Sequence, residues 1–361
     1  MTSNGAGMGH LVRMLAVAKR CSSRIQPIFL TMSQALGVVR DQGYLAEFLP
    51  FRTYLGVDSS AWNKHFEEEL NALITFYDPS VVVFDGSVPY RGLIDAIQSN
   101  PDPLFVWCRR GMWRRNNDDS IIKRERHFDA VIEPGELANA FDQGATAAYQ
   151  SRTVQVPPIR FLDDDEMLSR GEARNELELD QHRPAALVLL SSGNSFDFSH
   201  LRRIAIDRLV AAHDAQVVLG EWAIAAQERE QDAVHKRLSS FPFSRHFKAF
   251  DLVISALGYN SFHEILFTGV PVIFVPNEDA LTDNQAARGS FAERRGFGLM
   301  VRTREVYRMS EAIDRLLDPE QRAFVAQRAA AMEPINGAGH AARLIEEMAF
   351  SRRTDRDLMA Y

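Results

Sequence analysis

Three short segments of the sequence combine glycine with hydroxyl or amide residues, as phosphate-binding loops do. The first is NGAGMGH at residues 4–10, the second is SSGNS at 191–195, and the third is ALGYNS at 256–261. Glycine lets the backbone approach a ligand closely, and a helix N-terminus behind such a loop favours an anion. We therefore expect the first two segments to recognise phosphate groups or developing negative charge. The second segment lacks the lysine of a Walker loop, so ATP hydrolysis is not implied.

His10 ends the first glycine segment. A histidine at such a tip can take a proton from a hydroxyl nucleophile, or it can simply cap a helix or pack. The alternating glycines fit a dinucleotide-binding fingerprint poorly. Because only residues 1–3 precede them, we expect a shortened first strand or a start that lies upstream. Arg13, one helical turn further on, is a candidate for binding an anion or for a solvated position.

Glu264 is the main candidate in the segment 251–285. A strand over 252–255 ends in small residues, after which Asn260 or Ser261 is expected to cap a helix with Glu264 in its first turn. A carboxylate there can accept two ribose hydroxyls. Ser261 and Glu264 also have the spacing of a capping box, which would make Glu264 structural.

A second polar loop follows the strand over 270–275. It contains Glu278, and Asp283, Asn284 and Gln285 then open another helix. Open α/β sheets bind ligands at the carboxyl ends of their strands, where both loops would lie. Carboxylates and amides suit hydroxyl-rich ligands such as sugars. Plain helix capping would explain Asp283 but not the whole group.

Two further groups are candidates in the first half. Asp85 follows a continuous apolar strand over 81–84, and it could orient an acceptor or His10, or act as a cap or turn residue. Arg109, Arg110 and Trp113 lie in a basic and aromatic stretch. This stretch could contact an anionic acceptor or a membrane surface, or form a solvated loop. His263 is expected on a helix surface.

The elements that must position these residues alternate between short apolar runs and amphipathic stretches. Such alternation predicts an α/β fold with parallel sheets. We expect strands over 27–31, 81–84, 104–107, 130–132, 186–190, 216–219, 252–255, 270–275 and 299–301, and helices over 11–20, 61–76, 167–177, 202–212, 262–268, 284–295 and 306–317. The predicted domains are 1–155 and 169–340, with a linker over 156–168 and a C-terminal helix and tail over 341–361, of which 351–361 frays.

Composition narrows the function classes. The 361 residues suffice for two domains, and 46% hydrophobic with 25% charged residues is typical of a globular protein. The net charge of −7 argues against nucleic acid as a partner. Two isolated cysteines and scattered histidines predict no metal site. Without a long apolar run or a visible signal peptide, we expect a cytoplasmic protein.

Taken together, the motifs resemble the MurG-like branch of the GT-B glycosyltransferases over nearly the full chain. Residues 7–10 resemble the GxGH acceptor-side loop, 191–194 the diphosphate loop, and 170–179 the helix that opens the C-terminal domain. Residues 255–258, Glu264, 269–271 and 275–276 resemble the donor signature. Two departures are the pair Ser191-Ser192, where the family usually has glycines, and the bulky residues at 259–261.

The resemblance implies two facing Rossmann-like domains with an interdomain cleft. It implies inverting hexosyl transfer from a nucleotide sugar, UDP-linked in the family's usual case, with no metal or other cofactor. His10 would be the base, Glu264 would hold the ribose, and Asp283, Asn284 and Gln285 would face the sugar. The catalytic candidates are thus His10 and, from its place at the end of a strand, Asp85. The donor-binding set is Ser191, Ser192, Gly193, Asn194, Phe247, Leu257, Gly258, Tyr259, Asn260, Ser261, Glu264, Glu278, Asp283, Asn284 and Gln285. The acceptor-side set is Gly7, Gly9, Arg13, Arg109, Arg110 and Trp113.

The acceptor is not specified by these motifs. A lipid-linked or anionic acceptor would bring peripheral contact with the inner face of a membrane. Alternatives are a nucleotide-sugar hydrolase or epimerase of the same fold, and a binding subunit that has lost catalysis.

Overall fold

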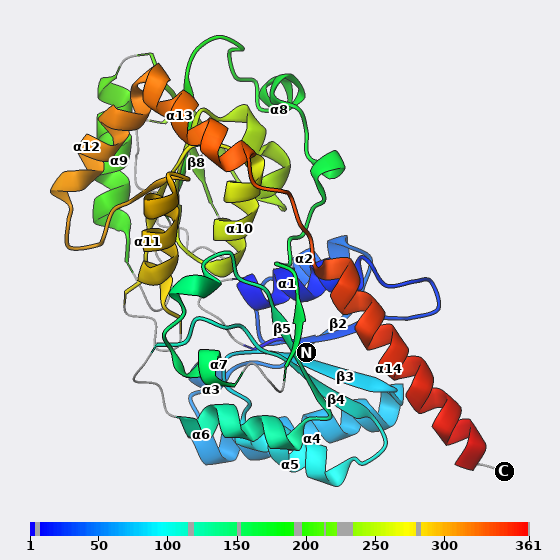
Figure 1. Cartoon of the computed structure of the whole chain (residues 1–361). Helices are drawn as coiled ribbons and strands as arrows, with labels where there is room; N and C mark the ends of the chain where they lie inside the picture. The colour runs from blue at the N-terminus through cyan, green and yellow to red at the C-terminus, as the bar shows by residue number, and fades with distance from the viewer. Residues whose placement is uncertain are drawn as a thin grey trace. The chain divides into compact units, whose positions relative to one another are not determined.

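The computed structural model describes residues 1–3, 8–114, 119–149, 153–190, 197–212, 214–221, 234–278 and 283–359 (Figure 1). The chain divides into two compact units. Unit 1 comprises 1–136, 143–159 and 337–361, and unit 2 comprises 137–142 and 160–336. The change at 159/160 lies within the expected linker. The assignment of 137–142 to unit 2, and of the C-terminal helix to unit 1, has no counterpart in the sequence-based prediction.

Unit 1 is built on parallel strands in the doubly wound order. The strands are β1 (Ile28–Thr31), β2 (Leu45–Phe48), β3 (Val81–Asp85), β4 (Leu104–Cys108), β5 (Ala130–Pro134) and β6 (Val154–Val156). Ladders β1-β2 and β3-β4-β5-β6 are joined by Thr2, which bridges in parallel to Thr31 and Asp85. The expected short first strand is thus this bridge. The strand order reverses between residues 1–3 and β3, and such a switch point is where doubly wound sheets bind ligands.

Helices cover both faces of this sheet. On one face, α4 (Ser59–Tyr77) presents Trp62, Phe66, Leu70 and Ile74, four residues apart, to a core shared with α5 (Arg91–Ser99) and with β3 and β4. Asp58 caps α4 by accepting hydrogen bonds from the backbone of the next turn. Elsewhere in the unit, α1 (Gly9–Ala18) packs against α14 (Ala338–Met359), and both helices contact β3 (Figure 1).

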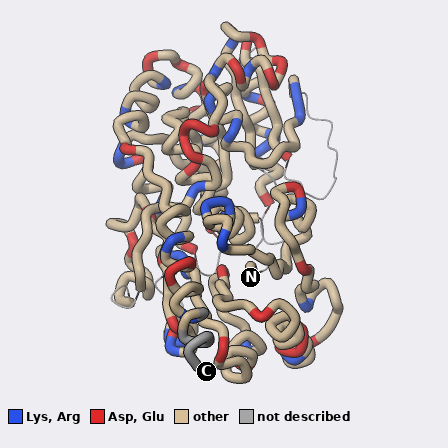
Figure 2. Tube along the Cα trace, turned by 90° about the vertical axis from the view of Figure 1, so that its right-hand side faces the viewer, with Lys and Arg blue, Asp and Glu red and all other residues tan. Residues whose placement is uncertain are grey.

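Short elements complete unit 1. They are α2 (Leu36–Asp41), α3 (Arg52–Leu55), α6 (Asp119–Ile122), the 3-10 turn Lys123–His127, and α7 (Ala145–Ala148). The expectation of a frayed tail over 351–361 is wrong for most of its length, because α14 continues to Met359. No helix in the described ranges is long and apolar enough to cross a membrane. Basic and acidic residues are interspersed over the described trace of both units (Figure 2).

Unit 2 repeats the doubly wound order with six parallel strands. The order is β12-β11-β10-β7-β8-β9, and it reverses between β7 and β10. The strands are β7 (Ala185–Leu189), β8 (Gln216–Gly220), β9 (Lys236–Leu238), β10 (Leu252–Ala256), β11 (Val272–Val275) and β12 (Leu299–Met300). The helices are α8 (Arg170–Glu176), α9 (Ser199–Ala211), α10 (Tyr259–Thr268), α11 (Gln285–Arg295), α12 (Tyr307–Leu317) and α13 (Pro319–Ala330), with 3-10 turns at Asn139–Phe141, Asp164–Glu166 and Phe243–Ala249.

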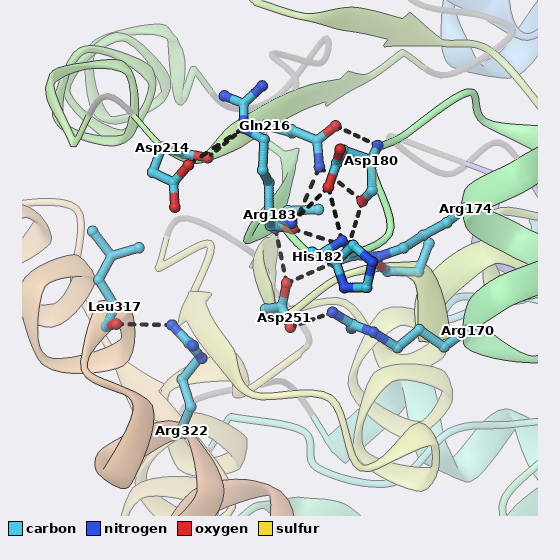
Figure 3. A network of polar contacts seen from close by, with 12 residues as sticks. Arg170, Arg174, Asp180, His182, Arg183, Asp214, Gln216, Asp251, Leu317 and Arg322 are labelled. Carbon is cyan, nitrogen blue, oxygen red and sulfur yellow. Dashed lines mark hydrogen bonds and ion pairs between the residues drawn. The ribbon is translucent and has the colours of Figure 1, made fainter.

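The buried Arg174 forms a hydrogen-bond network at the amino-terminal edge of the unit 2 sheet. Arg174 of α8 donates to the carbonyls of Ala249, Asp180 and Arg183 at 2.8, 2.6 and 2.9 Å, and to the Asp251 carboxylate at 2.8 Å (Figure 3). Asp251 also accepts from the backbone N–H of Ala185, where β7 begins. This network ties α8 to the starts of β7 and β10, at the edge opposite the one where ligands bind.

Candidate functional site

His10 and Asp85 meet at the switch point of unit 1. His10 is the second residue of α1, and Asp85 is the last residue of β3, directly beside the Thr2 bridge. The His10 Nδ1 lies 2.5 Å from the Asp85 Oδ1. A nitrogen this close to a carboxylate oxygen carries the proton and donates it, so the Nε2 lone pair is left as a proton acceptor. Among the roles considered for Asp85, the structure displays contact with His10.

Arg13 also contacts Asp85, from the next turn of α1. Its Nε donates to Asp85 Oδ2 at 2.7 Å, and its Nη2 donates to Oδ1. The same Nη2 lies 3.1 Å from His10 Nδ1. Arg13 and Asp85 are buried, whereas the His10 side chain keeps 12% of its exposure. The expectation that Arg13 binds an external anion or is solvated is wrong, because Arg13 is buried and its guanidinium donates to the Asp85 carboxylate.

The electrostatics of this cluster favour a charged aspartate and a neutral histidine. Burial alone would raise the pKa of Asp85, but Arg13 and His10 outweigh it and hold that pKa well below its usual range. Burial lowers the pKa of His10, Asp85 opposes this effect, and Arg13 and Arg110 add to it. An oriented, neutral imidazole of this kind is suited to general-base chemistry.

The basic and aromatic stretch divides into buried and half-buried residues. Arg109 is fully buried and pairs with Glu125 at 3.2 Å and Glu133 at 3.1 Å. Trp113 is also buried. Neither the solvated-loop interpretation nor direct acceptor contact fits these two residues. Arg110 is half-buried and acts electrostatically on His10, so it is the member of the stretch that adjoins the candidate base.

Glu264 lies deeper along its helix than predicted. α10 begins at Tyr259 with Gly258 as its N-cap, so the expected cap at Asn260 or Ser261, and with it the capping box, is wrong. Glu264 is therefore in the second turn and half-buried, and one of its oxygens accepts from the backbone N–H of Phe161 at 3.4 Å. Burial raises the pKa of Glu264 to about 7.

The other candidates on α10 and in the preceding 3-10 turn are mostly enclosed. Leu257, Tyr259 and Phe247 are buried, while Gly258, Asn260 and Ser261 are half-buried. His263 is fully buried, which corrects its expected surface position. Its Nδ1 donates to the Tyr259 carbonyl at 2.8 Å, and its Nε2 accepts from Leu137 at 3.3 Å, in the segment 137–142.

The polar side chains of the second loop are bound by neighbouring residues of unit 2. Glu278 accepts from Arg302 Nε at 3.0 Å. Asn284, not Asp283, caps α11, and the Gln285 side chain accepts from the Asn277 backbone at 2.8 Å. Asp283 is buried 2.7 Å from Arg288, a fully buried arginine that the sequence-based prediction missed. The spacing of five residues between these opposite charges was the available signal.

The remaining candidates are divided between described and undescribed residues. Gly9 is the first residue of α1. Gly7, Ser191, Ser192, Gly193 and Asn194 lie outside the described residues. Within the described part of the chain, no group of three or more His, Cys, Asp or Glu residues could hold a metal ion.

Comparisons with known proteins agree with this architecture. Residues 212–345 match the model of the glycosyltransferase family 28 C-terminal domain. Acinetobacter baumannii MurG is similar in structure, with a TM-score of 0.62 at 14% identity over 96% of this chain and 98% of that one. Residues 212–345 thus match a glycosyltransferase domain, and the chain as a whole has the GT-B fold of these structures.

Two other solved structures show how widely this fold is used. The Streptomyces sp. SF2575 glycosyltransferase SsfS6, complexed with thymidine diphosphate, has a TM-score of 0.62 at 14% identity over 96% of this chain and 98% of that chain. A Listeria monocytogenes protein assigned as a UDP-N-acetylglucosamine 2-epimerase has a TM-score of 0.65 at 12% identity over 97% and 96%. No curated protein matches the sequence.

Proposed function

We propose that this chain is a glycosyltransferase that moves a hexose from a UDP-linked donor to an acceptor hydroxyl, with inversion and without a bound metal. The observation that carries the proposal is the His10–Asp85 pair at the switch point of unit 1, with Nε2 left to accept a proton. The acceptor is lipid-linked or otherwise anionic, which is supported by the half-buried Arg110 beside His10. Both described cysteines are free, in keeping with a cytoplasmic site of action, at the membrane face for a lipid-linked acceptor.

The chemistry needs proton removal at the acceptor and charge stabilisation at the donor. His10 Nε2 takes the acceptor proton as the hydroxyl attacks the anomeric carbon, and Asp85 orients the imidazole and stabilises its charged form. The sugar–phosphate bond breaks, and the departing diphosphate gains negative charge. Helix N-termini at the carboxyl edge of the unit 2 sheet, that of α10 among them, would stabilise this charge. Glu264 would accept the ribose hydroxyls.

Calorimetric titration with UDP, GDP, TDP and ADP, comparing wild type with Glu264→Ala, tests the donor half of this proposal. We expect selective UDP binding that Glu264→Ala weakens several-fold. Binding of none of the four by folded protein would contradict a nucleotide-sugar donor, and selective binding of another diphosphate would replace uridine.

Turnover tests the acceptor half. With a UDP-hexose and a panel of anionic and lipid-linked alcohols, His10→Ala should lose about 10²–10⁴ in kcat while keeping UDP affinity. Near-wild-type turnover would refute the base role. Product anomers followed by NMR test inversion, and EDTA treatment tests metal independence. Because a 2-epimerase shares the fold, the donor is also followed without acceptor for free sugar or an epimer.

A further inference from the structure

Arg13 is a buried cation 3.1 Å from the candidate base, and the mechanism above gives it no task. α1 places it three residues after His10, so both side chains leave the same face of one helix. Both reach the Asp85 carboxylate. Oδ1 accepts from His10 and from Arg13 Nη2, and Oδ2 accepts from Arg13 Nε at 2.7 Å. The carboxylate is therefore fixed in position by a two-point contact before His10 uses it.

A buried carboxylate beside a histidine has two opposing consequences. It orients the ring, but its charge also stabilises the imidazolium, which cannot accept a proton. A paired arginine removes this conflict because the Arg13–Asp85 pair has no net charge. The carboxylate keeps its hydrogen bond to Nδ1, while the guanidinium, with Nη2 3.1 Å from the same nitrogen, disfavours a proton on Nε2.

We propose that Arg13 is a positioning residue that aligns Asp85 on His10 and cancels the carboxylate's charge, so that His10 stays neutral and able to accept a proton. This inference rests on the proposed role of His10 as the base. Other groups also face the cluster. Arg110 acts on His10, and the Met1 ammonium and the Cys108 thiol lie near Asp85.

The test is an NMR titration of the His10 imidazole, assigned by loss of its signal in His10→Ala. The variants are Arg13→Gln, Arg13→Lys and the double variant Arg13→Gln/Asp85→Asn. Arg91→Gln, which removes an exposed arginine paired with Asp95, is the matched control. We expect the His10 titration to move up by about one pH unit or more in Arg13→Gln. It should stay near wild type in Arg13→Lys and in the control.

The double variant separates the two charges. Without Asp85, nothing in the pair favours the imidazolium, so His10 should titrate below its position in Arg13→Gln. In turnover, the acid limb of kcat/KM should follow the NMR titration in each variant. Arg13→Lys should lower kcat because a single ammonium cannot reproduce the two-point contact.

An Arg13→Gln protein whose His10 titrates at or below the wild-type position overturns the proposal, whatever its activity. If Arg13→Gln does not fold, Arg13→Lys decides, because wild-type kcat in that variant overturns the two-point positioning. Failure of the proposed function would look different. His10→Ala would then retain turnover, while the NMR titrations would still report on the charge balance.

Discussion

Glu264 should destabilise the folded protein at neutral pH, and Glu264→Gln should remove that cost. Burial raises the pKa of Glu264 from 4.5 to about 7. The folded chain therefore holds this proton between those two pH values, whereas the unfolded chain has released it. Because the unfolded state binds fewer protons, stability falls as pH rises through this window and levels off above about pH 7.

The size of the effect follows from the same values. The difference between 4.5 and about 7 corresponds to about 3 kcal/mol, and partial exposure of the side chain reduces it to about 2 kcal/mol. Glutamine is neutral at every pH. Relative to wild type, Glu264→Gln should therefore gain about 2 kcal/mol of unfolding free energy between about pH 5 and about pH 8.

The assay is calorimetric unfolding of wild type and variants at these two pH values. Glu278→Gln is the matched control, since Arg302 holds the pKa of Glu278 below its ordinary value and this variant should not gain stability as pH rises. UDP affinity is measured in parallel. Because the terminal phosphate of UDP itself titrates at about pH 6, the affinities of wild type and Glu264→Gln are compared with each other at each pH. Wild type should gain affinity relative to the variant as Glu264 ionises.

A Glu264→Gln protein with the same pH dependence of stability as wild type would contradict the raised pKa of Glu264 in the folded protein. Glu264 would then ionise at its ordinary pH in the folded state. A variant that gains stability at high pH but binds UDP as well as wild type would confirm the burial argument and refute the ribose contact. The two readouts thus separate the electrostatics of the residue from its proposed task.

Three further substitutions test the packing around the site. Arg109→Met leaves two buried carboxylates without their cation and should cost about 3–5 kcal/mol in chemical denaturation. Gly144→Ala would place a Cβ 1.5 Å from the Trp113 carbonyl oxygen. The clash should lower the free energy of unfolding by about 1–3 kcal/mol or more, which is measured as a lower melting temperature. The Asn336 side chain accepts a hydrogen bond from the Arg160 N–H and donates one to the Arg160 carbonyl, both at 3.1 Å. Asn336→Ala should therefore lower the free energy of unfolding by about 1–2 kcal/mol in chemical denaturation.

Local sequence pattern predicted the strands well because a strand buried on both faces needs a continuous apolar run. Each expected strand is present, with ends shifted by a few residues. β2 was missed because two of its four side chains, Leu45 and Phe48, are exposed, so its pattern does not match that of a buried strand. The start of α10 was placed too late because Asn260 and Ser261 are good caps, yet Gly258 supplies the extended backbone at which the helix begins.

Side-chain partners were harder to predict because they come from distant parts of the chain. Arg13 pairs with Asp85, which lies 72 residues further along the sequence. Arg109 pairs with Glu125 and Glu133, which follow it by 16 and 24 residues. From sequence alone, each arginine looks like a solvent-exposed charge, and only the topology shows that each has a buried carboxylate partner. The pairing of His10 with Asp85 could be considered because Asp85 ends a strand, and the structure brings that strand end beside the Thr2 bridge that precedes His10.

Buried arginines at opposite sheet edges should give different phenotypes when they are replaced. Arg174 binds three carbonyls and Asp251 at the amino-terminal edge of the unit 2 sheet, where no ligand is expected. Arg13 binds one carboxylate at a carboxyl-terminal edge, and that carboxylate holds a histidine. Arg174→Met should therefore lower stability and leave the pH dependence of kcat/KM unchanged. A shifted acid limb in Arg174→Met would show that loss of stability alone can move the profile, and the pH shift in Arg13 variants would then no longer indicate a specific role.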